Sequence, residues 1–116
     1  MFEKLKSMFG GKTKVSDINK RLSKKLHNMH FKYISEKLDD ENEIIIGRDG
    51  HLNLEGENSE ILCATSGIDT LFRLNIAEMK IWEFMSLNGC VITFTDIDTG
   101  KVRNVSVYYD AHLVRT

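Results

Sequence analysis

Short runs of alternating apolar and polar residues occupy much of the chain after residue 42, and turn-forming residues separate them. The clearest of these turns is Asp49-Gly50, which follows Ile44-Ile45-Ile46 and precedes the alternating segment Leu52-Asn53-Leu54. An Asp-Gly pair between such runs is the strongest short-range signal for a β-hairpin with a type I′ turn. Strands joined by connections this short run antiparallel. The sequence therefore predicts an antiparallel β-sheet.

The spacing of turn residues predicts about five to six strands arranged as hairpins. Six segments fit the pattern, namely 43–48, 51–55, 60–65, 70–76, 90–98 and 102–109. The chain has no proline, so glycine, asparagine and aspartate must form its turns.

Two segments show helical periodicity. Ser16 is a favourable N-cap for a helix over 16–38, with an apolar stripe formed by Ile18, Leu22, Leu26, Met29 and Tyr33. A second helix is expected over 77–88, inserted between strands, with Ala77, Ile81, Phe84 and Met85 on its main face. Gly89 would end it. Both helices are expected to pack on one face of the sheet.

These elements predict an α+β fold, because the helices are segregated from an antiparallel sheet. The 116 residues suffice for one domain, expected over 16–116. Residues 1–15 are expected to form a short amphipathic N-terminal segment, whose apolar positions Phe2, Leu5, Met8 and Phe9 share one helical face.

The charges are divided unevenly along the chain. Residues 1–37 contain ten basic and three acidic side chains, a net charge of +7, whereas residues 38–116 carry −8. One interpretation is that the basic segment lies against the acidic remainder or is simply solvated. The other is that it contacts an anionic surface, either membrane lipid or nucleic acid. The residues expected to make that contact are Lys12, Lys14, Lys20, Arg21, Lys24 and Lys25.

Both predicted helices carry more apolar residues than one buried stripe requires. The surplus residues are Phe31, Ile34 and Leu38 on the first helix and Met79, Trp82 and Leu87 on the second. Core packing and a protein interface both explain them, and Trp and Met are enriched at interfaces. Since two-fold dimers are the commonest oligomers, we expect a homodimer with Trp82 at or near the contact.

No metal or phosphate site emerges from the residue spacing. His27 and His30 stand three apart on the predicted helix, but no third ligand lies within a turn of them. The segment 96–100 begins like a calcium loop, yet its glycine comes too early and position 12 would be Val107. Gly10-Gly11-Lys12-Thr13 lacks the first glycine of a phosphate-binding loop. We therefore expect neither a metal nor a cofactor.

Catalytic signatures are also missing from the sequence. Cys63 and Cys90 each alternate with an isoleucine, as core residues do, and no nucleophile motif surrounds them. Two cysteines are too few for a secreted disulfide framework, and no segment of signal-peptide type is present, so a cytoplasmic location is expected.

The sequence therefore predicts a small non-enzymatic interaction module that associates with itself or with another protein. The alternative is a peripheral protein that contacts an anionic surface through residues 1–37.

Overall fold

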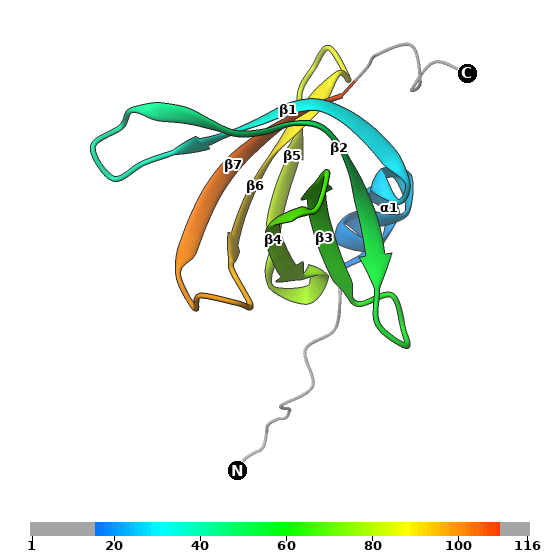
Figure 1. Ribbon diagram of the computed structural model, residues 1–116. Coiled ribbons are helices and arrows are strands. Elements are labelled where there is room, and N and C mark those ends of the chain that lie inside the picture. The colour runs from blue at the N-terminus through cyan, green and yellow to red at the C-terminus, as the bar shows by residue number, and fades with distance from the viewer. Residues whose placement is uncertain (1–15, 110–116) are drawn as a thin grey trace.

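Within residues 16–109, one helix and seven strands make up the fold (Figure 1). The computed structural model describes residues 16–109. Its elements are the helix α1 (Asp17–Leu26), strands β1 (Met29–Lys37), β2 (Glu43–Glu55), β3 (Ile61–Ser66) and β4 (Asp69–Asn75), the 3₁₀ turn η1 (Ile76–Glu78), and strands β5 (Lys80–Glu83), β6 (Gly89–Thr95) and β7 (Val102–Tyr109). No helix within residues 16–109 has the length and apolar character needed to cross a membrane.

All seven strands belong to one antiparallel sheet, in the order β4-β3-β2-β1-β7-β6-β5. Neighbouring strands in the sheet are also neighbours in the chain, except for β1 and β7. That non-local pair joins β1–β4 to β5–β7 and places Ile34 opposite Val107. The predicted antiparallel sheet and α+β class are confirmed.

The sheet is rolled rather than flat. Its register shifts by one residue at three places, between β1 and β2, β1 and β7, and β3 and β4. Such irregularities bend strands and increase their twist. The roll brings β4 against β6, where the rings of Phe72 and Phe94 lie 4.8 Å apart. A backbone hydrogen bond of 2.9 Å from Ile97 N–H to Arg73 C=O also spans this seam.

Inward-facing side chains from every strand fill the roll. The largest fully buried residues include Phe31, Phe72 and Tyr109, together with leucine, isoleucine and valine from neighbouring strands. These residues alternate with outward ones, as a strand with one buried face requires.

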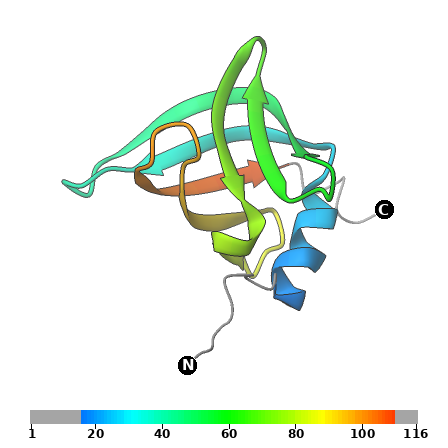
Figure 2. The same ribbon diagram turned by 90° about the horizontal axis from the view of Figure 1, so that it is seen from below.

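Helix α1 closes one end of the roll, beside η1 and β5 (Figure 2). The predicted N-cap is confirmed, since the Ser16 hydroxyl accepts a hydrogen bond from Asn19 N–H. Leu22 and Leu26 enter the core. The Asn19 amide donates to Ile76 C=O (2.7 Å) and Met79 C=O (3.0 Å), and Lys25 forms an ion pair with Glu83 of β5.

The predicted helix over 16–38 is wrong beyond residue 26. His27 N–H donates to Ser23 C=O and Lys24 C=O, and Asn28 then adopts a φ of 65°, which stops the helix. Residues 29–37 form the central strand β1 instead. Strand pairing on both sides overrides the helical spacing of Met29 and Tyr33. Ile18, expected in the core, is 56% exposed.

The predicted inserted helix over 77–88 is also wrong. The segment contains η1, strand β5 and the β5–β6 turn, in which Leu87 has a φ of 63°. Buried Ile81 and exposed Trp82 follow the two-residue period of a strand. Met85, expected on the buried face of the helix, is fully exposed.

The predicted hairpin turn at Asp49-Gly50 is wrong, since both residues lie inside the continuous strand β2. The true β1–β2 turn comprises residues 38–42, between the predicted helix over 16–38 and the predicted strand 43–48. Leu38 N–H donates to Asn42 C=O, and Glu41, with a φ of 69°, donates back to Leu38 C=O. Segments 43–48 and 51–55 therefore form one strand, and the sheet reaches seven strands rather than five to six because β1 and β5 lie where helices were predicted.

Gly50 has a different role from the one expected. A Cβ atom at Gly50 would lie 2.0 Å from Thr65 C=O and 2.4 Å from the Phe31 ring. Gly50 therefore lets Phe31 pack directly against the backbone of β2.

We predict that Gly50→Ala lowers the free energy of unfolding by about 2 kcal/mol or more, because overpacking shifts Phe31. Urea denaturation measures the effect. Gly67→Asn is the matched control: Gly67 has open space around it and a φ of 62°, which Asn tolerates, so the loss should be small. Equal losses in both variants would contradict the packing role of Gly50.

Candidate functional site

The outward surface of β5, β7 and β1 is unusually aromatic. Trp82 follows buried Ile81, Tyr108 lies between two buried neighbours in β7, and Tyr33 precedes buried Ile34. All three therefore point away from the core. With Phe84 they make up what we call the outer aromatic face: Tyr33, Trp82, Phe84 and Tyr108.

Three of these rings form a row across the strands. Tyr33 and Tyr108 are stacked with centroids 4.5 Å apart and planes at 22°, and Phe84 lies 5.2 Å from Tyr108 at 52°. Gly89 leaves room for the Phe84 ring beside Tyr108, since a Cβ atom at Gly89 would come within 2.6 Å of that ring. Cross-strand aromatic pairs of this kind stabilise a sheet and also present apolar surface.

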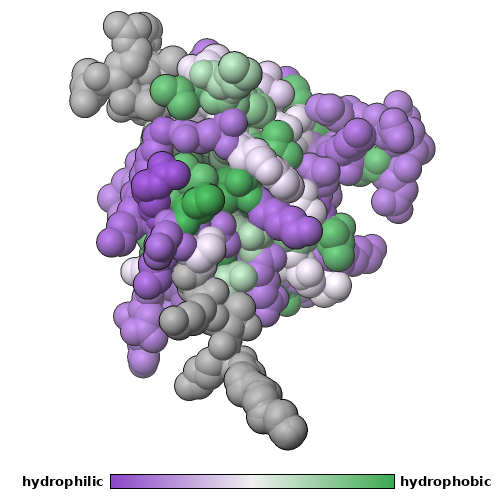
Figure 3. Space-filling model, turned by 180° about the vertical axis from the view of Figure 1, so that it is seen from behind, coloured by the Kyte–Doolittle hydropathy of each residue, from purple (hydrophilic) through white to green (hydrophobic). Residues whose placement is uncertain are grey.

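Further exposed apolar residues adjoin the outer aromatic face. A groove of about 370 Å³ lies between the start of α1 and the η1–β5 segment, lined in part by Ile18 and Trp82, which are each 56% exposed. Met85 and Leu87 are exposed in the β5–β6 turn. Seen from behind, the molecule shows an apolar patch bordered by hydrophilic side chains (Figure 3). Solvated sheet faces normally carry polar residues, so the outer aromatic face and the exposed apolar residues beside it are a candidate contact site.

The six interface residues expected from the sequence are divided between the core and the surface. Phe31, Ile34 and Met79 are buried within this one chain. Leu38 is exposed, but in the β1–β2 turn. Of the six residues, only Trp82 belongs to the outer aromatic face, and Leu87 is exposed in the adjoining β5–β6 turn. Tyr33, Phe84 and Tyr108 were not among the six residues. A two-residue period around 81–84 was the signal that could have placed Phe84 on the same side of the sheet as Trp82.

The expected anionic-surface residues are also divided. Lys12 and Lys14 lie outside the described residues. Lys20, Arg21 and Lys24 are exposed on α1, whereas Lys25 is paired with Glu83. Because residues 29–37 form β1, the basic segment 1–37 does not form one continuous helical surface.

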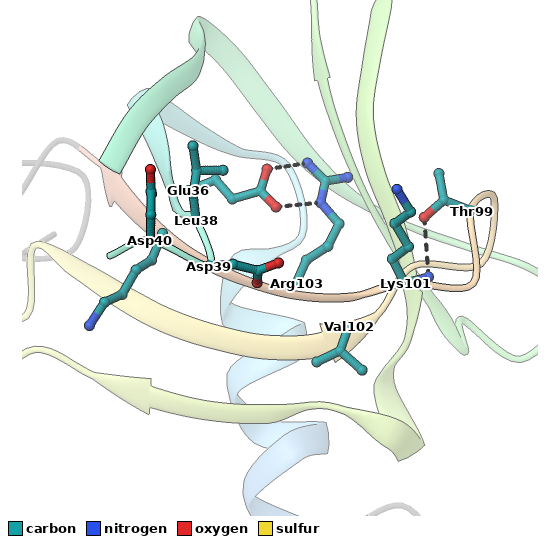
Figure 4. A pocket seen from close by; sticks show the side chains of 9 residues that line it. Glu36, Leu38, Asp39, Asp40, Thr99, Lys101, Val102 and Arg103 are labelled. Atoms are coloured by element: carbon teal, nitrogen blue, oxygen red, sulfur yellow. Dashed lines mark hydrogen bonds and ion pairs between the residues drawn. The ribbon is translucent and has the colours of Figure 1, made fainter. Parts of the chain in front are cut away.

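A second candidate lies where β1, β7 and β4 meet. The Arg103 guanidinium binds the Glu36 carboxylate through two hydrogen bonds of 2.9 and 2.7 Å (Figure 4). It also donates to Asp96 (2.6 Å) and to Leu71 C=O (3.0 Å). Leu71 is the β4 residue left unpaired where the register shifts. We call Arg103, Glu36 and Asp96 the arginine cluster.

The arginine cluster has the properties of a structural clamp rather than an anion-binding site. Four of the five N–H groups of Arg103 already have acceptors. The hydrogen bonds to Glu36 raise the pKa of Arg103 above its ordinary value, although burial acts in the opposite direction. Asp96 is only 2% exposed. An adjoining groove of about 610 Å³ is bordered by the β1–β2 and β6–β7 turns (Figure 4).

Both cysteines are unsuited to nucleophilic chemistry. Burial raises the pKa of the Cys63 thiol to about 11, and the charge of Glu55 adds to that rise. Burial likewise raises the pKa of Cys90 to about 12, with a further contribution from the charge of Glu83. Because the thiolate is the reactive form, both side chains are unreactive at neutral pH.

The histidines weighed in the sequence analysis do not converge. The Nδ1 atom of His27 accepts a hydrogen bond from Leu54 N–H, whereas His30 lies on β1 opposite His51, with ring centroids 5.3 Å apart. Asp96, the first residue of the segment that begins like a calcium loop, is paired with Arg103 in the arginine cluster. Among residues 16–109, no three His, Cys, Asp or Glu side chains are grouped so that they could hold a metal ion.

Comparison with known proteins adds no candidate function: no family model matches the chain, and no match was found among curated proteins or solved structures.

We predict that Arg103→Met lowers the free energy of unfolding by about 3–5 kcal/mol, because Glu36 and Asp96 would remain charged without their partner. Thermal and urea denaturation measure the loss. The control is Arg73→Met, which removes more exposed ion pairs to Glu55 and Asp98 and should cost much less. A smaller loss at Arg103 than at Arg73 would contradict the clamp.

We also predict alkaline destabilisation through Cys90. Below pH 9 the thiol is protonated in both states, whereas between pH 9 and 12 only the unfolded chain loses the proton. The free energy of unfolding should therefore fall by up to about 1.4 kcal/mol per pH unit in this range. Cys90→Ala should show a shallower slope in urea titrations above pH 9. Identical slopes would show that Cys90 ionises freely in the fold.

Proposed function

We propose that this protein is a non-enzymatic interaction module that associates with a second copy of itself through the outer aromatic face. The observation that carries the proposal is the exposure of Trp82, at 56%, beside the row formed by Phe84, Tyr108 and Tyr33. Trp and Tyr are the residues most often found at the energetic centre of protein interfaces.

A second copy is the partner that this surface fits. In a two-fold dimer the same patch on each subunit covers the other, so an apolar and aromatic surface is self-complementary. Two copies also repel one another little, because the net charge of the chain is only −1. Burial of Trp82 between the two copies would explain why a large aromatic residue occupies an outward position on β5.

The alternative function is contact with an anionic surface through α1. It is supported by Lys20, Arg21 and Lys24, all of which are exposed on that helix. Such contact would weaken steeply with salt, whereas association through aromatic side chains would not.

We predict that Trp82→Glu raises the dimer dissociation constant at least about 30-fold while the chain stays folded. Sedimentation of both proteins across a concentration series measures the change, and circular dichroism reports the fold. The control is Ile68→Glu, which introduces the same charge at a fully exposed apolar residue of the β3–β4 turn and should leave association unchanged.

The proposal fails if wild-type protein sediments as a monomer at millimolar concentration. It also fails if Ile68→Glu weakens association as much as Trp82→Glu, since the effect would then be one of charge alone. Salt-sensitive binding to anionic vesicles or nucleic acid by a protein that stays monomeric would favour the charged surface of α1 instead.

A further inference from the structure

The apolar stripe of helix α1 continues beyond the part that the sheet covers. Ile18, Leu22 and Leu26 are spaced four residues apart, so they share one face of the helix. Leu22 and Leu26 are buried, whereas Ile18, in the first turn, is 56% exposed. Ile18 borders the groove of about 370 Å³ between the start of α1 and the η1–β5 segment, and the exposed Trp82 borders the same groove. Two large apolar side chains are therefore exposed on one groove.

The polar groups of this groove already have partners within the fold. The Asn19 side-chain amide donates to two backbone carbonyl groups of the η1–β5 segment, and the Ser16 hydroxyl accepts a hydrogen bond from Asn19 N–H. Among the lining residues of the described chain, only Lys80 is charged. The surface that the groove leaves uncovered is thus mainly that of Ile18 and Trp82, which suits an apolar occupant better than an ion.

The part of the chain that leads into this groove is rich in apolar side chains. Residues 1–15, which we call the N-terminal segment, lie outside the described residues, and the described chain begins at Ser16, which itself lines the groove. The apolar residues that the sequence predicts on one helical face of the N-terminal segment are Phe2, Leu5, Met8 and Phe9. The groove and this apolar face are therefore close along the chain.

The connection between the two is short and permits the chain to fold back. The six residues 10–15 span at most about 20 Å, so the apolar face can reach the groove that begins at Ser16. Gly10 and Gly11 tolerate the backbone conformations that a reversal requires. A segment tethered this closely has an effective concentration in the millimolar range. At lower protein concentrations it therefore has an advantage over the same segment of a second copy.

We propose that residues 2–9 dock in this groove of their own chain and cover Ile18 and Trp82 with their apolar face. The docking does not depend on self-association. Its consequence rests on the proposed function: because Trp82 belongs to the outer aromatic face, the docked segment competes with a second copy for that side chain. Each copy must release its segment before it associates, which raises the apparent dissociation constant of the dimer.

Paramagnetic NMR on the full-length, ¹⁵N-labelled protein tests the docking. A nitroxide spin label is attached at position 7 through Ser7→Cys, a position opposite the apolar face of the predicted helix. Cys63 and Cys90 are buried, so the introduced thiol takes the label. At a concentration at which the protein is monomeric, the label should broaden the indole N–H signal of Trp82 and the amide signals of residues 79–82.

A pair of variants in the spin-labelled protein separates docking from mere tethering. Leu5→Asp and Thr13→Asp add the same charge to the N-terminal segment, but only Leu5 belongs to its apolar face. Leu5→Asp should restore most of the lost Trp82 signal, whereas Thr13→Asp should restore little of it.

Sedimentation of the same two variants without the label tests the effect on self-association. Leu5→Asp should lower the dimer dissociation constant at least about 10-fold, because the groove is vacated in both copies. Thr13→Asp is the matched control and should leave the dissociation constant close to that of the wild type.

The docking is overturned if Leu5→Asp and Thr13→Asp show equal broadening, since tethering alone would then explain it. It is also overturned if ¹⁵N-labelled chains are broadened only when they are mixed with separate spin-labelled chains, which would assign the groove to the segment of a second copy. Equal dissociation constants for wild type and Leu5→Asp would reject the competition with self-association. If every variant sediments as a monomer, self-association itself fails, and the paramagnetic result still decides the docking.

Discussion

The arginine cluster is the interaction on which the rolled shape of the sheet most depends. Arg103 on β7 holds the Glu36 carboxylate of β1 and reaches across to Leu71 C=O on β4, so one guanidinium joins strands from distant positions in the sheet. A sheet held closed in this way buries side chains from every strand. Helix α1 then has to cover only the remaining end, which it does with Leu22 and Leu26.

Closure of the sheet also explains why the aromatic side chains are divided between two surfaces. The interior takes Phe31, Phe72 and Phe94, and the register of β1 with β7 sets Tyr33 beside Tyr108 on the outside. The outer aromatic face therefore results from the same strand pairing that forms the core. We propose it as the contact surface because Trp82 is exposed there, whereas the arginine cluster and both cysteines are largely buried within the fold.

The sequence was informative where the determining contacts are local. The Ser16 cap, the start of α1 and the alternation in β6 and β7 could all be predicted from neighbouring residues. Residues 29–37 could not, because their helical spacing is overridden by pairing with the adjacent strand β2 and with β7, which is distant in sequence. The same holds for the candidate site: Trp82 was identified from its type, whereas Tyr33 joins Tyr108 and Phe84 only through the non-local β1–β7 pair.

Cross-saturation NMR on the wild-type protein tests the central claim most directly. Deuterated, ¹⁵N-labelled chains are mixed with unlabelled chains, and saturation of the unlabelled copies is transferred only across the contact between them. The account predicts signal loss at the Trp82 indole N–H and at the amides of β5, the β5–β6 turn and the end of β7. Signal loss confined to α1 or to the β1–β2 turn, with the Trp82 indole unaffected, would contradict it.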